Sequence, residues 1–144
     1  MRQSSAVARG RGSCVGLLAG NVLAMTESRR ATLLAVLLGT MGTLHFLVPR
    51  PFDRLIPRAL PGTARTWTYA SGVGELGTAL LISVPRTRRL GGLLAALLFV
   101  AVFPGNVKMA LDAKTTPSKI VAITRLPLQW PLVAWALRVR DGRD

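Results

Sequence analysis

Residues 67–84 of the chain read WTYASGVGELGTALLISV, with Glu75 as the only charged side chain. The stretch is apolar and long enough to cross a membrane as a helix. A carboxylate inside a hydrocarbon layer costs several kcal/mol of free energy unless it finds a partner or takes up a proton, so such a residue marks a functional site by default. The stretch therefore predicts a membrane-spanning helix that carries a functional group.

Three further blocks have the same length of 18 residues and the same apolar character, namely residues 31–48, 90–107 and 120–137. A hydrocarbon core ~30 Å thick needs about 20 apolar helical residues, with ~17 as the lower limit. None of the blocks alternates apolar and polar residues as a barrel strand does, and none has the polar face of a soluble amphipathic helix. The sequence predicts an all-α fold, an integral membrane four-helix bundle with antiparallel neighbours and short connections.

The chain carries 19 Lys and Arg residues against 6 Asp and Glu residues, a formal net charge of +13. The basic residues lie in the connectors and tails rather than in one stripe, which favours membrane lipids over nucleic acid as partners. Arginines are densest at residues 29–30, 86–89 and 138–143, all at span ends on one side of the predicted bundle. Because cytoplasmic segments are rich in Lys and Arg, we expect both termini in the cytoplasm of a multi-pass inner (plasma) membrane protein.

The first 30 residues have a different composition, rich in Ser, Gly, Ala and Arg. A short apolar run at residues 14–25 behind basic residues has the shape of a weak signal peptide. In a second reading, translation starts at Met25 rather than at Met1. We expect residues 1–30 to be an unstructured or misassigned leader, residues 31–138 to form the membrane domain, and residues 139–144 to be a charged tail.

The single cysteine and the single histidine exclude several kinds of chemistry. Cys14 is the only cysteine, so no disulfide within the chain can form, and it lies outside the four blocks. His45 is the only histidine, so a haem held by two histidines of one chain is excluded. His45 and Glu75 would give a metal ion only two strong ligands, and no metal site is expected. No Gly-rich phosphate loop is present.

The connector at residues 48–66 contains four prolines and a short apolar pattern. Its apolar residues follow the spacing i, i+3, i+4, i+7, i+8 of one helix face: Phe52, Leu55, Ile56, Ala59 and Leu60. The prolines restrict the helix to one or two turns. Two readings stay open, a short amphipathic helix that lies on the membrane surface and a loop stiffened by proline.

The polar side chains of the four blocks share one depth. At a rise of about 1.5 Å per residue, all of them fall between the membrane midplane and the outer surface. The cytoplasmic half is lined by Gly, Ala and Leu. Arg125 can extend towards the midplane, so a pair between Glu75 and Arg125 is expected. The sequence predicts one outward-facing polar pocket, built from His45, Ser71, Glu75, Asn106, Arg125 and Gln129.

Five short motifs occur in a fixed order along the chain: G-x-x-H-F, S-G-x-x-E, P-x-T-R-R, F-P-x-N and R-L-P-L-Q. Together they resemble the DoxX-like family of small bacterial membrane proteins over about residues 30–138. The resemblance implies a four-helix membrane protein in which the polar motif positions are His45, Glu75, Asn106, Arg125 and Gln129. The namesake of the family is linked to a membrane thiosulfate:quinone oxidoreductase, and relatives are linked to redox assemblies.

These observations favour a small redox-associated subunit whose pocket binds a lipophilic ligand, with quinone as the expected cofactor. Glu75 would carry a proton or a hydrogen bond, Arg125 would tune its charge, and His45 and Gln129 would contact the head group. The chain would be at most one subunit of a membrane oxidoreductase, and the sequence assigns no catalytic residue. Its partners would be membrane lipids and another membrane or redox protein, and an oligomer is compatible with this reading.

Two other functions stay open. In the first, the chain is a structural or assembly protein, and the polar cluster only holds the helices together. In the second, it is a small transporter that couples flux to protonation of Glu75, which four helices could support only as an oligomer or with a partner.

Overall fold

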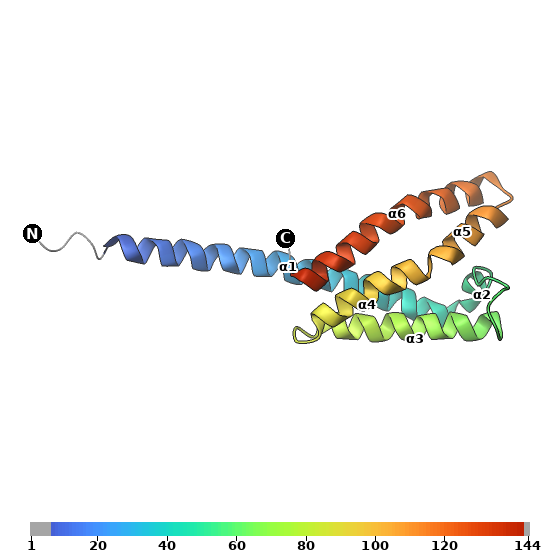
Figure 1. Cartoon of the computed structure of the whole chain (residues 1–144), viewed down its shortest axis with the longest axis horizontal. Helices are drawn as coiled ribbons and strands as arrows, with labels where there is room; N and C mark the ends of the chain where they lie inside the picture. Colours follow the sequence, from blue (N-terminus) through green and yellow to red (C-terminus); the bar gives the residue numbers. More distant parts are fainter. Residues whose placement is uncertain (1–6, 143–144) are drawn as a thin grey trace, which may run out of the picture.

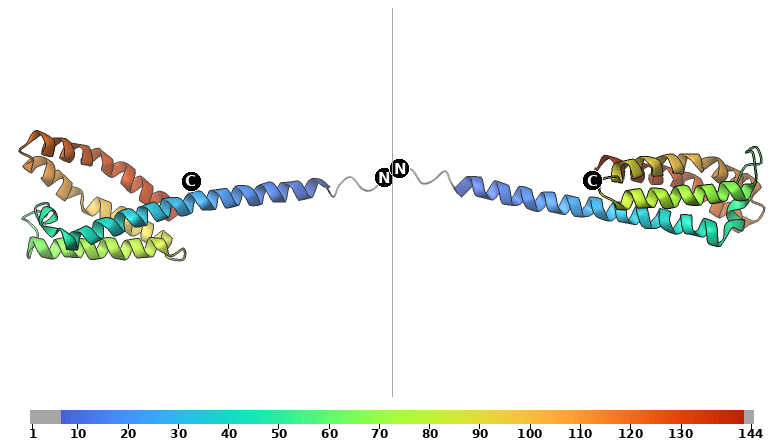
Figure 2. Two further views of the ribbon diagram at one scale, coloured as in Figure 1. Left: turned by 180° about the vertical axis from the view of Figure 1, so that it is seen from behind. Right: turned by 90° about the horizontal axis from the view of Figure 1, so that it is seen from below.

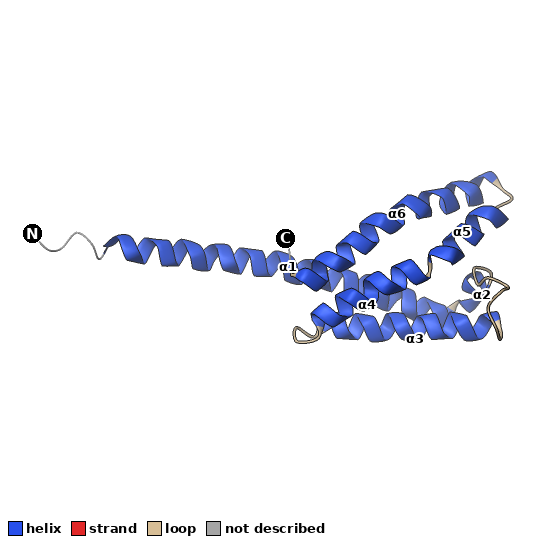
Figure 3. Ribbon diagram, in the orientation of Figure 1, coloured by secondary structure: helices blue, strands red, loops and turns tan. Residues whose placement is uncertain are grey.

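The computed structural model describes residues 7–142, with side chains from residue 26 onward. Within this range the chain is all-helical (Figure 3). The helices are α1 (Val7–Leu47), α2 (Pro49–Asp53), α3 (Ala64–Ser83), α4 (Arg88–Ala101), α5 (Phe103–Asp112) and α6 (Thr116–Asp141). The prediction of an all-α fold is therefore confirmed.

Two helix ends differ from the expected boundaries. Helix α1 begins at Val7 and runs without a break for 41 residues, so most of the segment expected to be an unstructured or misassigned leader is helical, and the domain boundary at residue 31 stays a prediction. Residues 1–6 lie outside the described range. Helix α6 continues to Asp141, three residues beyond the expected end of the domain, and Gly142 ends it with a left-handed φ of 62°.

The third predicted block is divided between α4 and α5, with the break at Val102. The amide of Val102 still donates to the carbonyl of Leu98, at 3.0 Å. Pro104 has no N–H, and its ring would collide with the carbonyl four residues earlier, so the helix cannot continue unbroken. The proline therefore bends this segment where the sequence pattern suggested one straight helix.

Three helical segments of the described range are long and apolar enough to cross a membrane. They are Thr26–Leu47 within α1, Arg88–Asp112 formed by α4 and α5, and Thr116–Asp141 of α6. Large apolar side chains are exposed on them, with Leu111 80% and Trp130 79% exposed. A water-soluble surface rarely gathers so much apolar area, so these segments indicate a membrane protein. Helix α3 has 20 residues but is less apolar, because it carries Glu75, several glycines and hydroxyl side chains.

The long helices pack in two pairs, α1 against α3 and α4 against α6, and α3 also contacts α4 (Figures 1 and 2). Small residues allow this close packing. A Cβ atom on Gly72 of α3 would lie 3.1 Å from the carbonyl oxygen of Gly42 in α1. A Cβ atom on Gly92 of α4 would lie 2.6 Å from the amide nitrogen of Arg140 in α6. Each helix pair therefore crosses where glycine lets the backbones touch.

The apolar core lies at one end of the molecule, beside the connection between α3 and α4. Its largest fully buried side chains include Leu34 and Leu38 of α1, Ile82 of α3 and Val139 of α6. The other end carries α2, the loop of residues 54–63 and the connection between α5 and α6 (Figure 1). We call it the α2 end.

Candidate functional site

A cavity of about 430 Å³ lies at the α2 end, between α1, α3, the break before α5 and the segment of residues 52–60. Its wall is mainly apolar, with a few polar side chains. Five of the six residues predicted from the sequence line it: His45, Ser71, Glu75, Asn106 and Arg125. They come from four different helices, so the structure brings together residues that are up to 80 positions apart in the chain.

The apolar residues of the connector cover this cavity. Phe52, Leu55, Ile56, Ala59 and Leu60 all line it. The pattern read from the sequence is therefore one face in the structure, but this face is turned towards the cavity. Only the five residues of α2 are helical, and the rest of the segment passes through turns, as its prolines require.

His45 and Glu75 meet across the contact between α1 and α3. The Nδ1 atom of His45 lies 3.3 Å from Oε2 of Glu75 and 2.8 Å from the carbonyl oxygen of Met41. A carbonyl oxygen can only accept, so Nδ1 carries a proton and donates it to Met41. The ring stacks on Phe52, with centroids 3.9 Å apart. His45 is thus held in one orientation by its own helix and by the covering segment.

The carboxylate of Glu75 is buried and incompletely paired. Its Oε2 atom accepts no hydrogen bond from the described residues, because the nearby Nδ1 proton is directed to Met41. A buried polar atom without a partner costs about 1–3 kcal/mol. The arrangement therefore leaves this oxygen free to accept a hydrogen bond from a group that enters the cavity.

The expected pair between Glu75 and Arg125 is not the one that forms. Among the described residues, the contact of the carboxylate is with His45. Arg125 is half-buried and lines the same cavity from α6. The helix packing explains this choice. Helices α1 and α3 touch at Gly42 and Gly72, each within one turn of His45 or Glu75, and this contact brings the two side chains together. Helix α6, which carries Arg125, packs mainly against α4.

Asn106 and Gln129 satisfy each other next to the break in α4–α5. The amide nitrogen of Asn106 donates to Oε1 of Gln129 at 3.0 Å, and the side-chain nitrogen of Gln129 donates to the carbonyl of Phe99. Both side chains are buried, and carbonyl groups in the last turn of a helix lack helical partners. Gln129 does not line the main cavity but a smaller groove of about 210 Å³ beside Phe103. This pair joins α5 to α6 and the end of α4.

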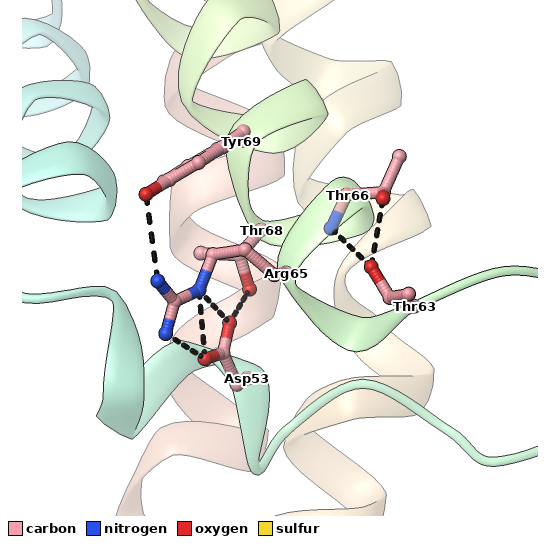
Figure 4. A network of polar contacts seen from close by, with 6 residues as sticks. All are labelled: Asp53, Thr63, Arg65, Thr66, Thr68 and Tyr69. Carbon is pink, nitrogen blue, oxygen red and sulfur yellow. Dashed lines mark hydrogen bonds and ion pairs between the residues drawn. The ribbon is translucent and has the colours of Figure 1, made fainter.

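A cluster of polar contacts, shown in Figure 4, fastens the covering segment to α3. Asp53 accepts from Nη2 of Arg65 at 2.8 Å, from its Nε at 3.0 Å, and from the hydroxyl of Thr68 at 2.7 Å. These donors hold the pKa of the Asp53 carboxyl below its usual range, the contact with Arg65 being the largest cause. The indole of Trp67 donates to the carbonyl of Pro61 at 2.7 Å. We call Asp53, Arg65 and Thr68 the α2 clamp.

Sequence reasoning missed the α2 clamp. Asp53 and Arg65 are 12 positions apart across a loop, and no helical or strand periodicity relates them. The only sequence signal is an unlike-charge pair on either side of a proline-rich connector, which many loops share. In the described part of the chain no three metal-ligating side chains gather, either at the cavity or elsewhere.

Comparison with known families places the chain in one of them. A family described as a domain of unknown function (DUF8561) matches residues 34–140, and the chain belongs to it. The match begins within the apolar part of α1 and ends near the end of α6, so it includes every residue that lines the cavity. No curated protein and no solved structure matches the chain. The resemblance to the DoxX-like family stays a prediction.

Proposed function

We propose that this member of the DUF8561 family binds a lipophilic molecule with a polar head group in the cavity at the α2 end. The observation that supports this most is the buried Oε2 atom of Glu75 beside a mainly apolar cavity: it lies 3.3 Å from His45, but among the described residues it accepts no hydrogen bond. Small-molecule sites typically combine an apolar wall with a few polar groups that fix orientation, and have volumes of about 300–1,000 Å³. The cavity agrees with each of these properties.

A quinone head group fits the chemistry of this cavity. Its carbonyl oxygens accept hydrogen bonds and its reduced form donates them. Glu75 in its protonated form donates to a quinone, and in its ionised form accepts from a quinol. Arg125 lines the same cavity from α6 and would supply a further hydrogen-bond donor to the head group. We propose Glu75 as the residue that exchanges the proton, with His45 and Ser71 contacting the head group. Gln129 acts through Asn106, since it lies outside the cavity wall.

The proposal includes a membrane arrangement. Helix α3 crosses the membrane as a fourth span, because it packs between α1 and α4, two of the segments that qualify as spans. Four spans form an antiparallel four-helix bundle with both termini in the cytoplasm of the inner (plasma) membrane. The α2 end then faces outward. The chain serves as a small subunit of a redox assembly, in line with the DoxX-like resemblance, and another membrane protein supplies the electron transfer.

Mass spectrometry of solvent extracts tests the proposal. The protein is purified in nanodiscs as wild type, Glu75→Gln and Glu27→Gln, the last being the same chemical change on α1 away from the cavity. We expect the wild type and Glu27→Gln to retain a quinone or another lipophile near one per chain, and Glu75→Gln to lose it. Extracts that contain only bulk lipid in all three proteins would contradict the proposal.

A structural role is the second candidate, and the pair of Asn106 and Gln129 favours it. These two buried amides satisfy each other and a helix carbonyl, and this bonding needs no ligand. If the whole polar cluster only holds helices together, Glu75→Gln lowers the unfolding temperature, and no bound molecule changes. A stable Glu75→Gln protein that has lost a bound lipophile would rule out this role.

A further inference from the structure

A second and larger cavity, of about 860 Å³, lies at the α2 end next to the first. The loop after α2, the end of α5 and the start of α6 line it. Four basic side chains line it, and two acidic ones. The basic residues are Arg54, Arg58, Lys108 and Lys114; the acidic residues are Asp53 and Asp112. We call this cavity the basic basin.

Both acidic side chains of the basin are already engaged. Asp53 accepts from Arg65 and Thr68 in the α2 clamp. Asp112 pairs with Lys108 one helical turn away, and the ammonium group of Lys108 also donates to the carbonyl of Arg54 at 2.9 Å. Lys108 is therefore a structural cation that ties α5 to the loop after α2. It does not contribute a free positive charge to the basin.

Three cations have no direct hydrogen-bond or ion-pair partner, although the charge of Asp112 also acts on Arg58 and Lys114 at longer range. Within residues 26–142, the side chains of Arg54, Arg58 and Lys114 form no ion pair or hydrogen bond with the protein. All three are exposed, and they reach the basin from two separate segments of the chain. Helix α6 adds the positive end of its dipole, since its N-cap residue Thr115 and Ser118 of its first turn line the same basin. Like charges repel, so this arrangement lowers its energy when an anion enters.

One wall of the basin is apolar and is shared with the neighbouring cavity. Leu55, Ile56, Pro57, Leu60 and Trp67 line both. An inorganic anion makes no use of an apolar wall, and the volume is far larger than one phosphate group needs. A head group with apolar material attached satisfies both the cations and the wall. Guanidinium groups bind phosphate oxygens in a bidentate fork, so two arginines favour phosphate over a less demanding anion.

We propose that the basic basin binds a phosphate monoester or diester, with the head group of an anionic phospholipid as its main source. Arg58 and Lys114 hold the phosphate from opposite sides, and Arg54 adds a third charge. The apolar wall contacts the first methylene groups of the acyl chains. This site is separate from the one proposed for the lipophile beside Glu75, and neither proposal depends on the other.

Native mass spectrometry of the purified protein in detergent tests the site. The protein is incubated with an equimolar mixture of phosphatidylglycerol and phosphatidylcholine, and the lipid retained on the intact chain is counted. We expect the wild type to retain phosphatidylglycerol about tenfold over phosphatidylcholine, and Arg58→Gln/Lys114→Gln to lose this preference. Arg50→Gln/Lys119→Gln is the matched control. It removes the same two charges from the same end of the molecule, at exposed residues that do not line the basin.

The possible results separate the proposal from unspecific attraction. Equal loss in both double variants would show that only the overall charge matters and would overturn the site. A wild-type protein with no preference between the two lipids would overturn it even if the variants failed to fold. Restored preference in Arg58→Lys/Lys114→Arg would support it.

Competition by glycerol phosphate identifies the source of the phosphate. If soluble glycerol phosphate displaces phosphatidylglycerol from the wild type, the basin also accepts free phosphate esters. If it does not, the lipid is the ligand. Either result supports a phosphate site, provided that the lipid preference is present and depends on Arg58 and Lys114.

Discussion

The two ends of the molecule differ in how closely their helices pack. At the α3–α4 end, Leu34, Leu38 and Ile82 are fully buried and a glycine of α4 touches the backbone of α6, so the helices pack closely there around an apolar core. At the α2 end, the same helices diverge, and two cavities lie between them and the covering segment. The close-packed end gives the helices a fixed geometry. That geometry lets the α2 end keep a buried carboxylate that is not fully paired.

The comparison predicts its largest effect at Gly92. A valine there would place Cβ 2.6 Å from the amide nitrogen of Arg140 and 2.9 Å from the carbonyl oxygen of Ala136, both backbone atoms that cannot rotate away. We expect Gly92→Val to cost about 3 kcal/mol or more, since overpacking that moves backbone is severe. Thermal unfolding in detergent measures the effect. Gly77→Ala is the control, because nothing lies within 4 Å of its new Cβ, and an equal loss in both variants would contradict the close-packed interpretation.

An intermediate effect is expected at the amide pair of the α2 end. Asn106→Leu or Gln129→Leu alone leaves a buried partner unsatisfied, at about 1–3 kcal/mol each. The double variant removes both partners, so it should cost less than the sum by at least about 0.5 kcal/mol. Unfolding midpoints of the three variants provide the measurement. Thr124→Ala serves as the control, since that exposed hydroxyl bonds only to the carbonyl of Ile120 in its own helix. Strict additivity would show that the two amides do not act as a pair.

A smaller and local effect is expected when the α2 clamp is opened. Asp53→Asn removes the charge that Arg65 and Thr68 hold, so residues 49–62 should become less protected. Hydrogen exchange should accelerate several-fold in these residues, while α4 and α6 stay unchanged. Arg50→Gln, a change of charge in the same helix away from the clamp, should leave exchange as in the wild type. Faster exchange throughout the molecule would mean that the clamp supports the whole fold rather than the cover of the cavity.

The smallest predicted effect is on the pH dependence of the same segment. The folded pKa of Asp53 lies below its ordinary value, so the folded protein holds the ionised form more strongly than the unfolded chain does. The stabilisation is complete above the ordinary pKa of about 4 and is lost as the pH falls through the lower, folded value. The rate of amide hydrogen exchange in residues 49–62, corrected for the intrinsic pH dependence of exchange, should therefore rise only in acid. Asp53→Asn should reduce this rise to the part that comes from protonation of Asp112, the partner of Lys108, and a rise near neutral pH would point to another group.

Much of the fold could be predicted from the sequence because helices depend on local properties. Four apolar blocks of membrane length gave the long helices, and prolines indicated the short α2. The bend at Val102 was missed, although Pro104 was visible, because a proline in a long helix either bends it or ends it according to what packs nearby. The extension of α1 back to Val7 was also missed, since composition alone described that segment as a leader.

In the candidate site, too, local properties could be predicted from the sequence and the packing between helices could not. Counting depth along each helix placed His45, Glu75, Asn106 and Arg125 in the same half of the predicted bundle, and in the structure all four line one cavity. The depth argument works because the rise per residue of a helix is constant. It does not give rotation, and so the partner of Glu75 was predicted as Arg125, whereas the structure pairs it with His45.

The sequence by itself determined that this protein is helical and that its long helices are apolar enough for a membrane. Hydrogen bonds within a helix and the hydropathy of a segment are local, so they can be read along the chain. Only the tertiary structure decided which polar groups meet. The contact of Gly42 with Gly72 sets the crossing of α1 and α3 and brings His45 to Glu75. Such contacts depend on how far each helix is rotated, and rotation is settled by packing between distant residues.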